Sequence, residues 1–181
     1  MKLYHIDRTG RLKVGQKIDL IKDFYNDTTK NEYYLDGLSA HGMNYYLFDS
    51  KNNNFFIDVV FEYERMLHFP DKLSRYQAMY AFDLEGTIHF IEKRELEYNF
   101  YKIYEVEAKY FERYNINLVR GWSHCMASKY AKLYWSGGKD PVKEREPVYE
   151  YLLKMPVKIV REVKLSDLKK ESEKKKAKVK K

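Results

Sequence analysis

Short strand-like segments alternate irregularly with helical segments along this chain, and this irregular order is the feature that most restricts its fold. Strand patterns occupy residues 3–8, 74–82 and 101–108, and the closing segment MPVKIVREV at residues 155–163 carries another. A parallel sheet needs a crossover helix after each strand, which would give a regular βαβ repeat. Because the sequence shows no such repeat, it favours an α+β fold over a doubly wound sheet.

Three segments carry helical signals. Apolar residues recur at helical spacing from Phe55 to Pro70. Asp83 is a candidate N-cap for the next helix, and Ser123 for a third helix that ends at Gly137. Residues 22–54 are rich in Asp, Asn, Lys and Gly, which predicts a pocket-forming loop region. The expected fold therefore has about three helices.

The net charge of +7 is concentrated at one end of the chain. Residues 169–181 hold eight lysines and two glutamates, a net charge of +6, which leaves +1 for residues 1–168. A lysine-rich segment with few apolar residues cannot offset its ordering entropy by burial. We therefore expect a single domain over residues 1–168 and a flexible tail, disordered or a frayed helix, over residues 169–181.

The composition excludes several classes of protein. Cys125, the single cysteine, rules out an internal disulfide and a cysteine-cluster zinc site, and its surroundings predict a buried, inert thiol. The five histidines show no short ligand spacing, so no metal site is expected. Apolar runs are too short for a membrane span, and no signal peptide is apparent, so we expect a soluble cytoplasmic protein without membrane partners. Loops for nucleoside triphosphates or Rossmann dinucleotides are absent.

Four motifs follow one another along the chain. These are the YHI strand at the N-terminus, the SRYQAMY strand followed by a helix that begins with Leu84-Glu85, the YEVE strand, and Glu150 before the last strand. Their order resembles the ADP-ribosyltransferase superfamily. The chain is similar to small bacterial members, including the rifampin-modifying type, and to uncharacterised bacterial domains that share YHID and SRYQ. This resemblance spans residues 3–163 and implies a compact mixed or antiparallel β core of that type.

The resemblance implies that NAD is the substrate and assigns roles to several residues. His5 matches the first-strand histidine that hydrogen-bonds the nicotinamide ribose, while the backbone of Ile6 holds the nicotinamide amide. Tyr80 matches the aromatic residue on which the nicotinamide stacks. Glu150 matches the acidic residue that orients the acceptor nucleophile and stabilises the oxocarbenium-like ribose, with Glu105 as the alternative. The catalytic set is thus His5, Tyr80 and Glu150, and these side chains should line one cleft.

Further cofactor contacts are expected around this set. Arg8 and Arg75 are candidates to bind the NAD pyrophosphate with a bidentate guanidinium. Ser74 or Arg75 matches the polar helper of the second motif. Tyr45 and Tyr76 are substitutes for Tyr80 as the stacking residue.

Two functions remain open from the sequence. The first is an NAD-dependent ADP-ribosyltransferase that modifies a protein, a nucleic acid or a small molecule, with a toxin or phage-defence role implied by the family. Its cationic tail favours a nucleic-acid or ribosome-associated acceptor. The second is a non-catalytic nucleic-acid-binding or interaction module, in which tyrosines at positions 33–34 and 45–46 stack bases and the lysine tail supplies charge.

Overall fold

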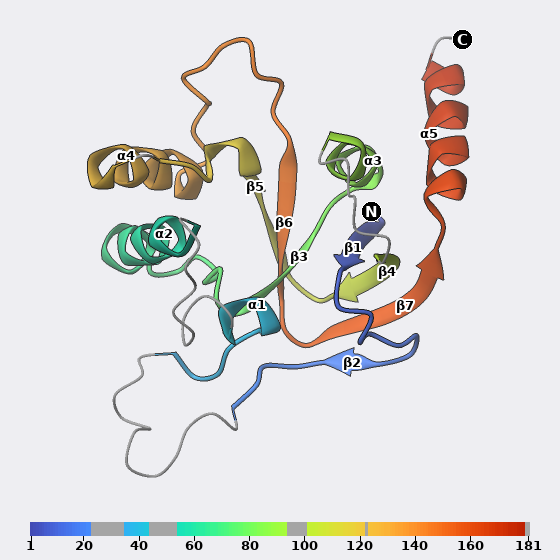
Figure 1. Ribbon diagram of the computed structural model, residues 1–181, viewed down its shortest axis with the longest axis horizontal. Helices are drawn as coiled ribbons and strands as arrows, with labels where there is room; N and C mark the ends of the chain where they lie inside the picture. The colour runs from blue at the N-terminus through green and yellow to red at the C-terminus, as the bar shows by residue number, and fades with distance from the viewer. Residues whose placement is uncertain (23–34, 44–53, 94–100, 122, 180–181) are drawn as a thin grey trace.

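The computed structural model describes residues 1–22, 35–43, 54–93, 101–121 and 123–179. Its strands are β1 (Leu3–Asp7), β2 (Lys17–Ile18), β3 (Ala78–Ala81), β4 (Lys102–Ala108), β5 (Phe111–Asn115), β6 (Tyr149–Lys154) and β7 (Val157–Val163). Its helices are α1 (Ala40–Gly42), α2 (Asn54–His68), α3 (Leu84–Lys93), the 3-10 helix η3 (Ile116–Leu118), α4 (His124–Trp135) and α5 (Leu165–Val179). Figure 1 shows their arrangement.

The strands form two antiparallel sheets, so the expected α+β class is confirmed. One sheet has the order β1-β4-β7-β2 and the other the order β3-β6-β5. A bridge between Tyr4 of β1 and Phe82, just after β3, joins the two sheets through two backbone hydrogen bonds of 2.8 Å. Helices α2 and α4 lie side by side against one sheet, whereas α3 and α5 lie near β1 and β7 (Figure 1).

Three apolar clusters hold these layers together. The first fills the space between the sheets, around Met79, Leu153 and Ile159. The second lies under α2 and α4 and includes Phe61 and Trp135. The third joins β1 and β4 to α3 and α5. Because the two sheets share one core, side chains from both can face a common cavity.

The N-cap residues expected from the sequence mark the starts of helices α3 and α4. The Asp83 carboxylate accepts a hydrogen bond of 2.8 Å from the backbone of Gly86 in α3, and the Ser123 hydroxyl accepts one of 3.4 Å from the backbone of Met126 in α4. These N-caps were expected from the sequence. Strand β3 is shorter than the expected segment 74–82, because Ser74 and Arg75 turn toward polar partners before the strand begins.

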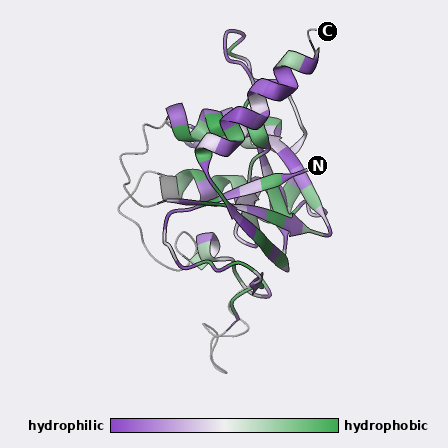
Figure 2. Ribbon diagram, turned by 90° about the vertical axis from the view of Figure 1, so that its right-hand side faces the viewer, coloured by the Kyte–Doolittle hydropathy of each residue, from purple (hydrophilic) through white to green (hydrophobic). Residues whose placement is uncertain are grey.

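Five α-helices are present in the described part of the chain, which corrects the expected number of about three. Helix α1 is a single turn, and α5 has few apolar residues, so neither carries a strong periodic signal. The predicted boundary at residue 168 falls inside α5, and residues 169–179 of the expected tail are helical, which is one of the two alternatives expected from the sequence. Leu168 is buried, and the Ser172 hydroxyl donates a 2.6 Å hydrogen bond to Glu85 of α3. Figure 2 shows how hydrophilic most of α5 is.

Cys125 is exposed, which corrects the prediction of a buried thiol. It lies in the first turn of α4, whose buried face is formed by Ala127 and Ala131 instead. Among the helices in the described ranges, none has both the length and the apolar character needed to cross a bilayer.

Candidate functional site

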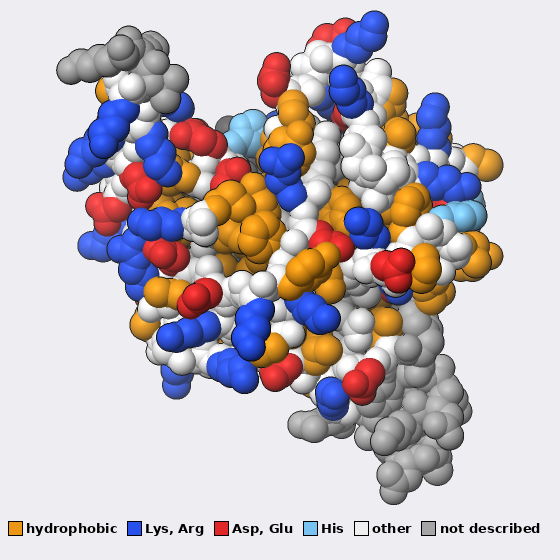
Figure 3. Space-filling model, turned by 180° about the vertical axis from the view of Figure 1, so that it is seen from behind, with side chains coloured by type: hydrophobic (Ala, Val, Ile, Leu, Met, Phe, Trp, Pro, Cys, Tyr) orange, Lys and Arg blue, Asp and Glu red, His pale blue; other side chains and the backbone are white. Residues whose placement is uncertain are grey.

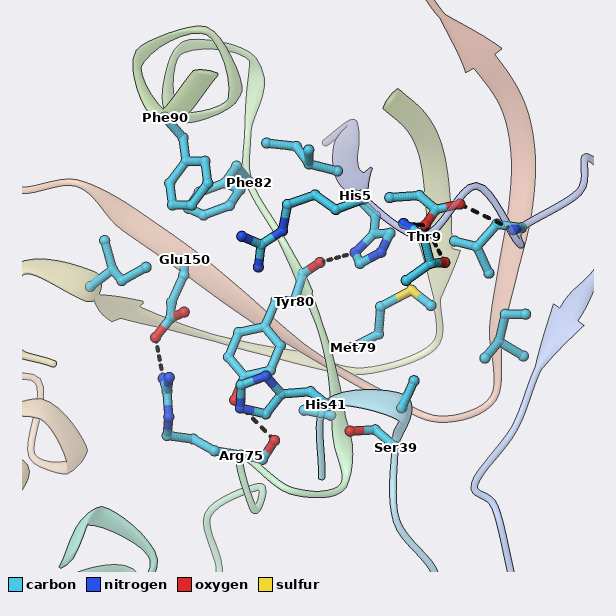
Figure 4. Close-up of a pocket in the computed structure, with 18 of the residues that line it drawn as sticks. His5, Thr9, Ser39, His41, Arg75, Met79, Tyr80, Phe82, Phe90 and Glu150 are labelled. Atoms are coloured by element: carbon cyan, nitrogen blue, oxygen red, sulfur yellow. Dashed lines mark hydrogen bonds and ion pairs between the residues drawn. The ribbon is translucent and has the colours of Figure 1, made fainter. Parts of the chain in front are cut away.

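A cavity of about 450 Å³ lies where the two sheets meet, with walls from β1, α1, α2, β3, α3 and β6 (Figure 4). Phe82 and Phe90 form part of its apolar wall, with ring centroids 4.7 Å apart. Six residues that the sequence singled out line it, namely His5, Ile6, Arg8, Arg75, Tyr80 and Glu150. The cavity thus brings together side chains from positions 5, 80 and 150 of the chain.

Other predicted site residues lie elsewhere. Ser74 is buried and donates a hydrogen bond of 3.0 Å to Glu62, and Tyr76 is buried against Leu35 and Leu38, so neither lines the cavity. Their roles as cofactor contacts stay predictions, although the Ser74 hydroxyl already has Glu62 as a partner and the Tyr76 ring packs in an apolar cluster. Glu105, the alternative acid, pairs with Arg161 on the four-stranded sheet. Tyr45, with the tyrosines at positions 33, 34 and 46, lies outside the described residues.

Glu150 lies within β6 and is fully buried, whereas the sequence placed it just before the last strand. Its Oε1 atom accepts hydrogen bonds from the Tyr134 hydroxyl at 2.7 Å and from Arg75 Nη1 at 2.5 Å. Its Oε2 atom is buried without a hydrogen-bond partner in the described part of the protein. A buried carboxylate oxygen without a donor is costly, and each such atom in a native structure calls for an explanation. Oε2 is therefore an acceptor without a donor among the described residues, in the wall of the cavity that Glu150 lines.

Arg75 connects two buried carboxylates. Its Nε atom donates to Asp58 Oδ1 at 3.0 Å, and its Nη1 atom donates to Glu150. Burial alone would lower the pKa of Arg75, but Glu150 and Asp58 raise it well above its ordinary value. Because these carboxylates already occupy the guanidinium, Arg75 is better suited to orient Glu150 than to bind a pyrophosphate. Arg8 also lines the cavity and is exposed there.

His5 is fixed by a short contact with β3. Its Nδ1 atom lies 2.6 Å from the carbonyl oxygen of Tyr80 (Figure 4). A carbonyl oxygen can only accept, so Nδ1 carries the proton and donates it. Burial lowers the pKa of His5 despite this hydrogen bond, which favours the neutral ring. Nε2 is then a hydrogen-bond acceptor, as a ribose hydroxyl would require.

The Tyr80 ring has close neighbours in the cavity. Its hydroxyl donates a hydrogen bond of 3.0 Å to the carbonyl of Arg75, and the Arg75 guanidinium lies 4.9 Å from the ring centroid. The His41 ring lies 4.5 Å away, tilted by 54°. Burial raises the pKa of Tyr80 well above its ordinary value, so the phenol is neutral. A flat ligand that stacks on Tyr80 must bind beside His41 or displace it.

The sequence did not identify three polar residues near this site, namely His41, Asp58 and Tyr134. Asp58 is buried in α2, with its Oδ2 atom 3.8 Å from His41 Nε2. It interrupts the apolar run FFIDVVF, and a carboxylate on the buried face of a helix needs a charged partner. That pattern could have identified Asp58. For His41, no comparable signal exists in the sequence.

We expect His41 to stay neutral down to unusually low pH. Burial lowers its pKa to about 4, although Asp58 opposes this shift. In the unfolded chain His41 has its ordinary pKa of 6.5, so between pH 6.5 and about 4 the unfolded state binds more protons than the folded state. The free energy of unfolding is therefore highest above pH 6.5 and falls as the pH drops toward 4. This contribution is about 3 kcal/mol for a shift of this size. An NMR titration of the histidine Cε1 protons measures the pKa. The substitution His41→Gln should flatten the pH dependence of urea unfolding, and an unchanged profile would contradict the assignment.

Asp7 shapes the turn that carries Arg8. Its carboxylate accepts hydrogen bonds from Thr9 (backbone 2.8 Å, hydroxyl 2.7 Å), from the backbone of Gly10 at 3.1 Å and from that of Leu12 at 3.1 Å. Burial alone would raise the pKa of Asp7, but these hydrogen bonds lower it below 3.8, so the stabilisation is lost as the pH falls below that value.

Asp7→Ala should lower the free energy of unfolding at neutral pH by about 2 to 3 kcal/mol, because the four donors of the turn lose their buried acceptor. Asp19, which is exposed and accepts one hydrogen bond from Leu20, provides the control, and Asp19→Ala should cost less than about 0.5 kcal/mol. Urea unfolding measures both. Equal costs for the two variants would show that the Asp7 turn is not organised by its carboxylate.

No group of three or more His, Cys, Asp and Glu side chains suited to hold a metal ion occurs in the described ranges. Three charged groups of the cavity, Asp58, Arg75 and Glu150, are instead joined in one chain of ion pairs.

The fold and the cavity define an α+β domain of two antiparallel sheets with a buried charged cluster at their junction. A family model described as a protein of unknown function (DUF2441) matches residues 18–165, and the chain belongs to this family. The match includes Arg75, Tyr80 and Glu150 and begins after His5. No curated protein matches the chain.

Proposed function

We propose that the protein is an NAD-dependent ADP-ribosyltransferase. The observation that carries the proposal is the position of His5, Tyr80 and Glu150, the three residues that the resemblance assigned to catalysis, around one cavity. A volume of about 450 Å³ is in the range of small-molecule sites and suits the nicotinamide riboside part of NAD. Arg8, exposed at the same cavity, is available to the pyrophosphate.

The chemistry asks little of the protein beyond positioning and charge. The glycosidic bond between the ribose C1′ and the nicotinamide nitrogen breaks, and neutral nicotinamide leaves with the bonding electrons. The ribose becomes positively charged, and the Glu150 carboxylate stabilises this charge. His5 Nε2 accepts a hydrogen bond from a ribose hydroxyl. The acceptor nucleophile then bonds to C1′ and loses its proton to solvent. The acceptor is a protein, a nucleic acid or a small molecule, and a toxin or phage-defence role depends on the resemblance alone.

Nicotinamide release from NAD, followed by NMR, tests this proposal. We expect wild-type protein to bind NAD saturably and to release nicotinamide, and His5→Ala to reduce release by roughly 10- to 100-fold through loss of ribose positioning. His89→Ala removes an exposed histidine on α3 outside the cavity and should leave release unchanged. Absence of saturable NAD binding by the wild type, or equal effects of the two histidine variants, would overturn the proposal.

A further inference from the structure

Helix α5 presents lysines in two rows that have different partners. The inner row faces α3, where Lys169 pairs with Glu92 at 2.7 Å and Lys176 pairs with Glu85 at 3.3 Å. Leu168 and Ser172 are buried on the same side. The inner lysines are therefore neutralised, and they belong to the contact that holds α5 on the domain.

The outer row consists of Lys170, Lys174 and Lys178, all of them exposed. Successive members are four residues apart, so they lie on one side of the helix with a rise of about 6 Å between them. In the described part of the chain, none of the three forms an ion pair with a carboxylate, whereas Lys175 pairs with Glu171. Asp167 and Glu173 are the other acids of α5, and both are exposed. The outer row is thus a line of cations without partners of its own.

Unlike this row, two cations on the neighbouring sheet are paired with carboxylates. Lys102 pairs with Glu162 at 3.2 Å, and Arg161 pairs with Glu105 at 2.7 Å. Since residues 1–168 carry a net charge of only +1, the excess positive charge of the protein lies in residues 169–181, which include most of α5. Figure 3 shows lysines and arginines gathered along the edge of the molecule that α5 forms.

We propose that the outer row of α5 binds the phosphate backbone of nucleic acid without sequence preference. A straight line of mobile ammonium groups matches a regular chain of phosphates and has no planar donors that read base edges. A lipid surface is less well matched, because an amphipathic helix binds membranes through an exposed apolar face, and the apolar side of α5 is packed against the domain. This inference is independent of the NAD chemistry.

Fluorescence anisotropy with a labelled DNA duplex of roughly 16 base pairs, over a series of salt concentrations, tests the proposal. Substituting Lys170→Gln, Lys174→Gln and Lys178→Gln together should weaken binding at least tenfold at low salt. It should also reduce the slope of log K against log salt by roughly 3, because three phosphate contacts are lost. Circular dichroism should show that the helix content is kept.

A charge-matched control replaces Lys13, Lys143 and Lys154, which are exposed and lie outside α5, with glutamine. This variant should keep the wild-type slope. Equal weakening by the two triple variants would assign binding to net charge and overturn the proposal. So would undetectable duplex binding by the wild type, or tighter binding to phosphatidylserine vesicles than to the duplex.

Discussion

Glu150→Gln is expected to reduce nicotinamide release by roughly 100- to 1,000-fold, which is the typical cost of removing one group that stabilises transition-state charge. The amide has the same shape but no charge, so it cannot stabilise the positive ribose. Because the side chain is fully buried in β6, the substitution also leaves Arg75 with Asp58 as its remaining carboxylate. We expect NAD affinity to change only a few-fold, so that the loss appears in kcat.

The same substitution should destabilise the fold, and the two effects must be separated. Removing one partner of a buried ion pair typically costs about 3 to 5 kcal/mol, and glutamine should retain part of the hydrogen bonding. Release should therefore be measured well below the melting temperature, and binding by calorimetry. Tyr134→Phe is the matched control, because it removes a hydrogen bond of 2.7 Å to Glu150 without removing charge. It should cost about 1 kcal/mol and less than tenfold in release. If the Glu150→Gln protein kept wild-type turnover, Glu150 would be excluded as the carboxylate that stabilises the ribose.

Gly42→Ala should be among the most destabilising single changes in the chain, at about 3 kcal/mol or more. A Cβ atom at this position would lie 2.1 Å from the backbone oxygen of Tyr76 and 2.9 Å from its carbonyl carbon. Backbone atoms cannot turn aside as a side chain can, so α1 would have to move. That movement would break the hydrogen bonds of 2.8 and 2.9 Å from Ser39 to the same oxygen and would displace His41 from Tyr80.

Gly10→Ala is the control for Gly42→Ala, because it introduces backbone strain without a steric clash. Gly10 has a φ of +68°, and a Cβ atom there would meet nothing within 4 Å, so the cost is the left-handed conformation alone, about 1 to 2 kcal/mol. Urea unfolding of both variants measures the difference, and NMR should show the pKa of His41 rising toward 6.5 in Gly42→Ala only. If Gly42→Ala is no less stable than Gly10→Ala, α1 does not pack against Tyr76 as described.

The sequence predicted some of the cavity residues but not the structure around them. His5, Tyr80 and Glu150 were singled out from the order of motifs, and all three line the same cavity. Their surroundings were not foreseen. Glu150 was expected just before the last strand, since YEYLLK was not separated from the strand that follows it, and the polar segment FERYN of β5, its partner strand, was overlooked. A strand buried on both faces and an edge strand with alternating charges both give weak local patterns.

The sequence by itself determined the features that depend on residues a few positions apart. Helix α2 was predicted from apolar spacing, although Val59, Tyr63 and Leu67 of that pattern are exposed. Helices α3 and α4 begin at the caps Asp83 and Ser123, and the charge of the C-terminal segment is a matter of composition. Only the tertiary structure decided that Arg75 meets Asp58, 17 residues before it, and Glu150, 75 residues after it. It also decided that α5 packs on α3 through Leu168 and Ser172. Such contacts form because burying apolar surface brings distant segments together, and buried charges are then stable only where the fold supplies an opposite partner.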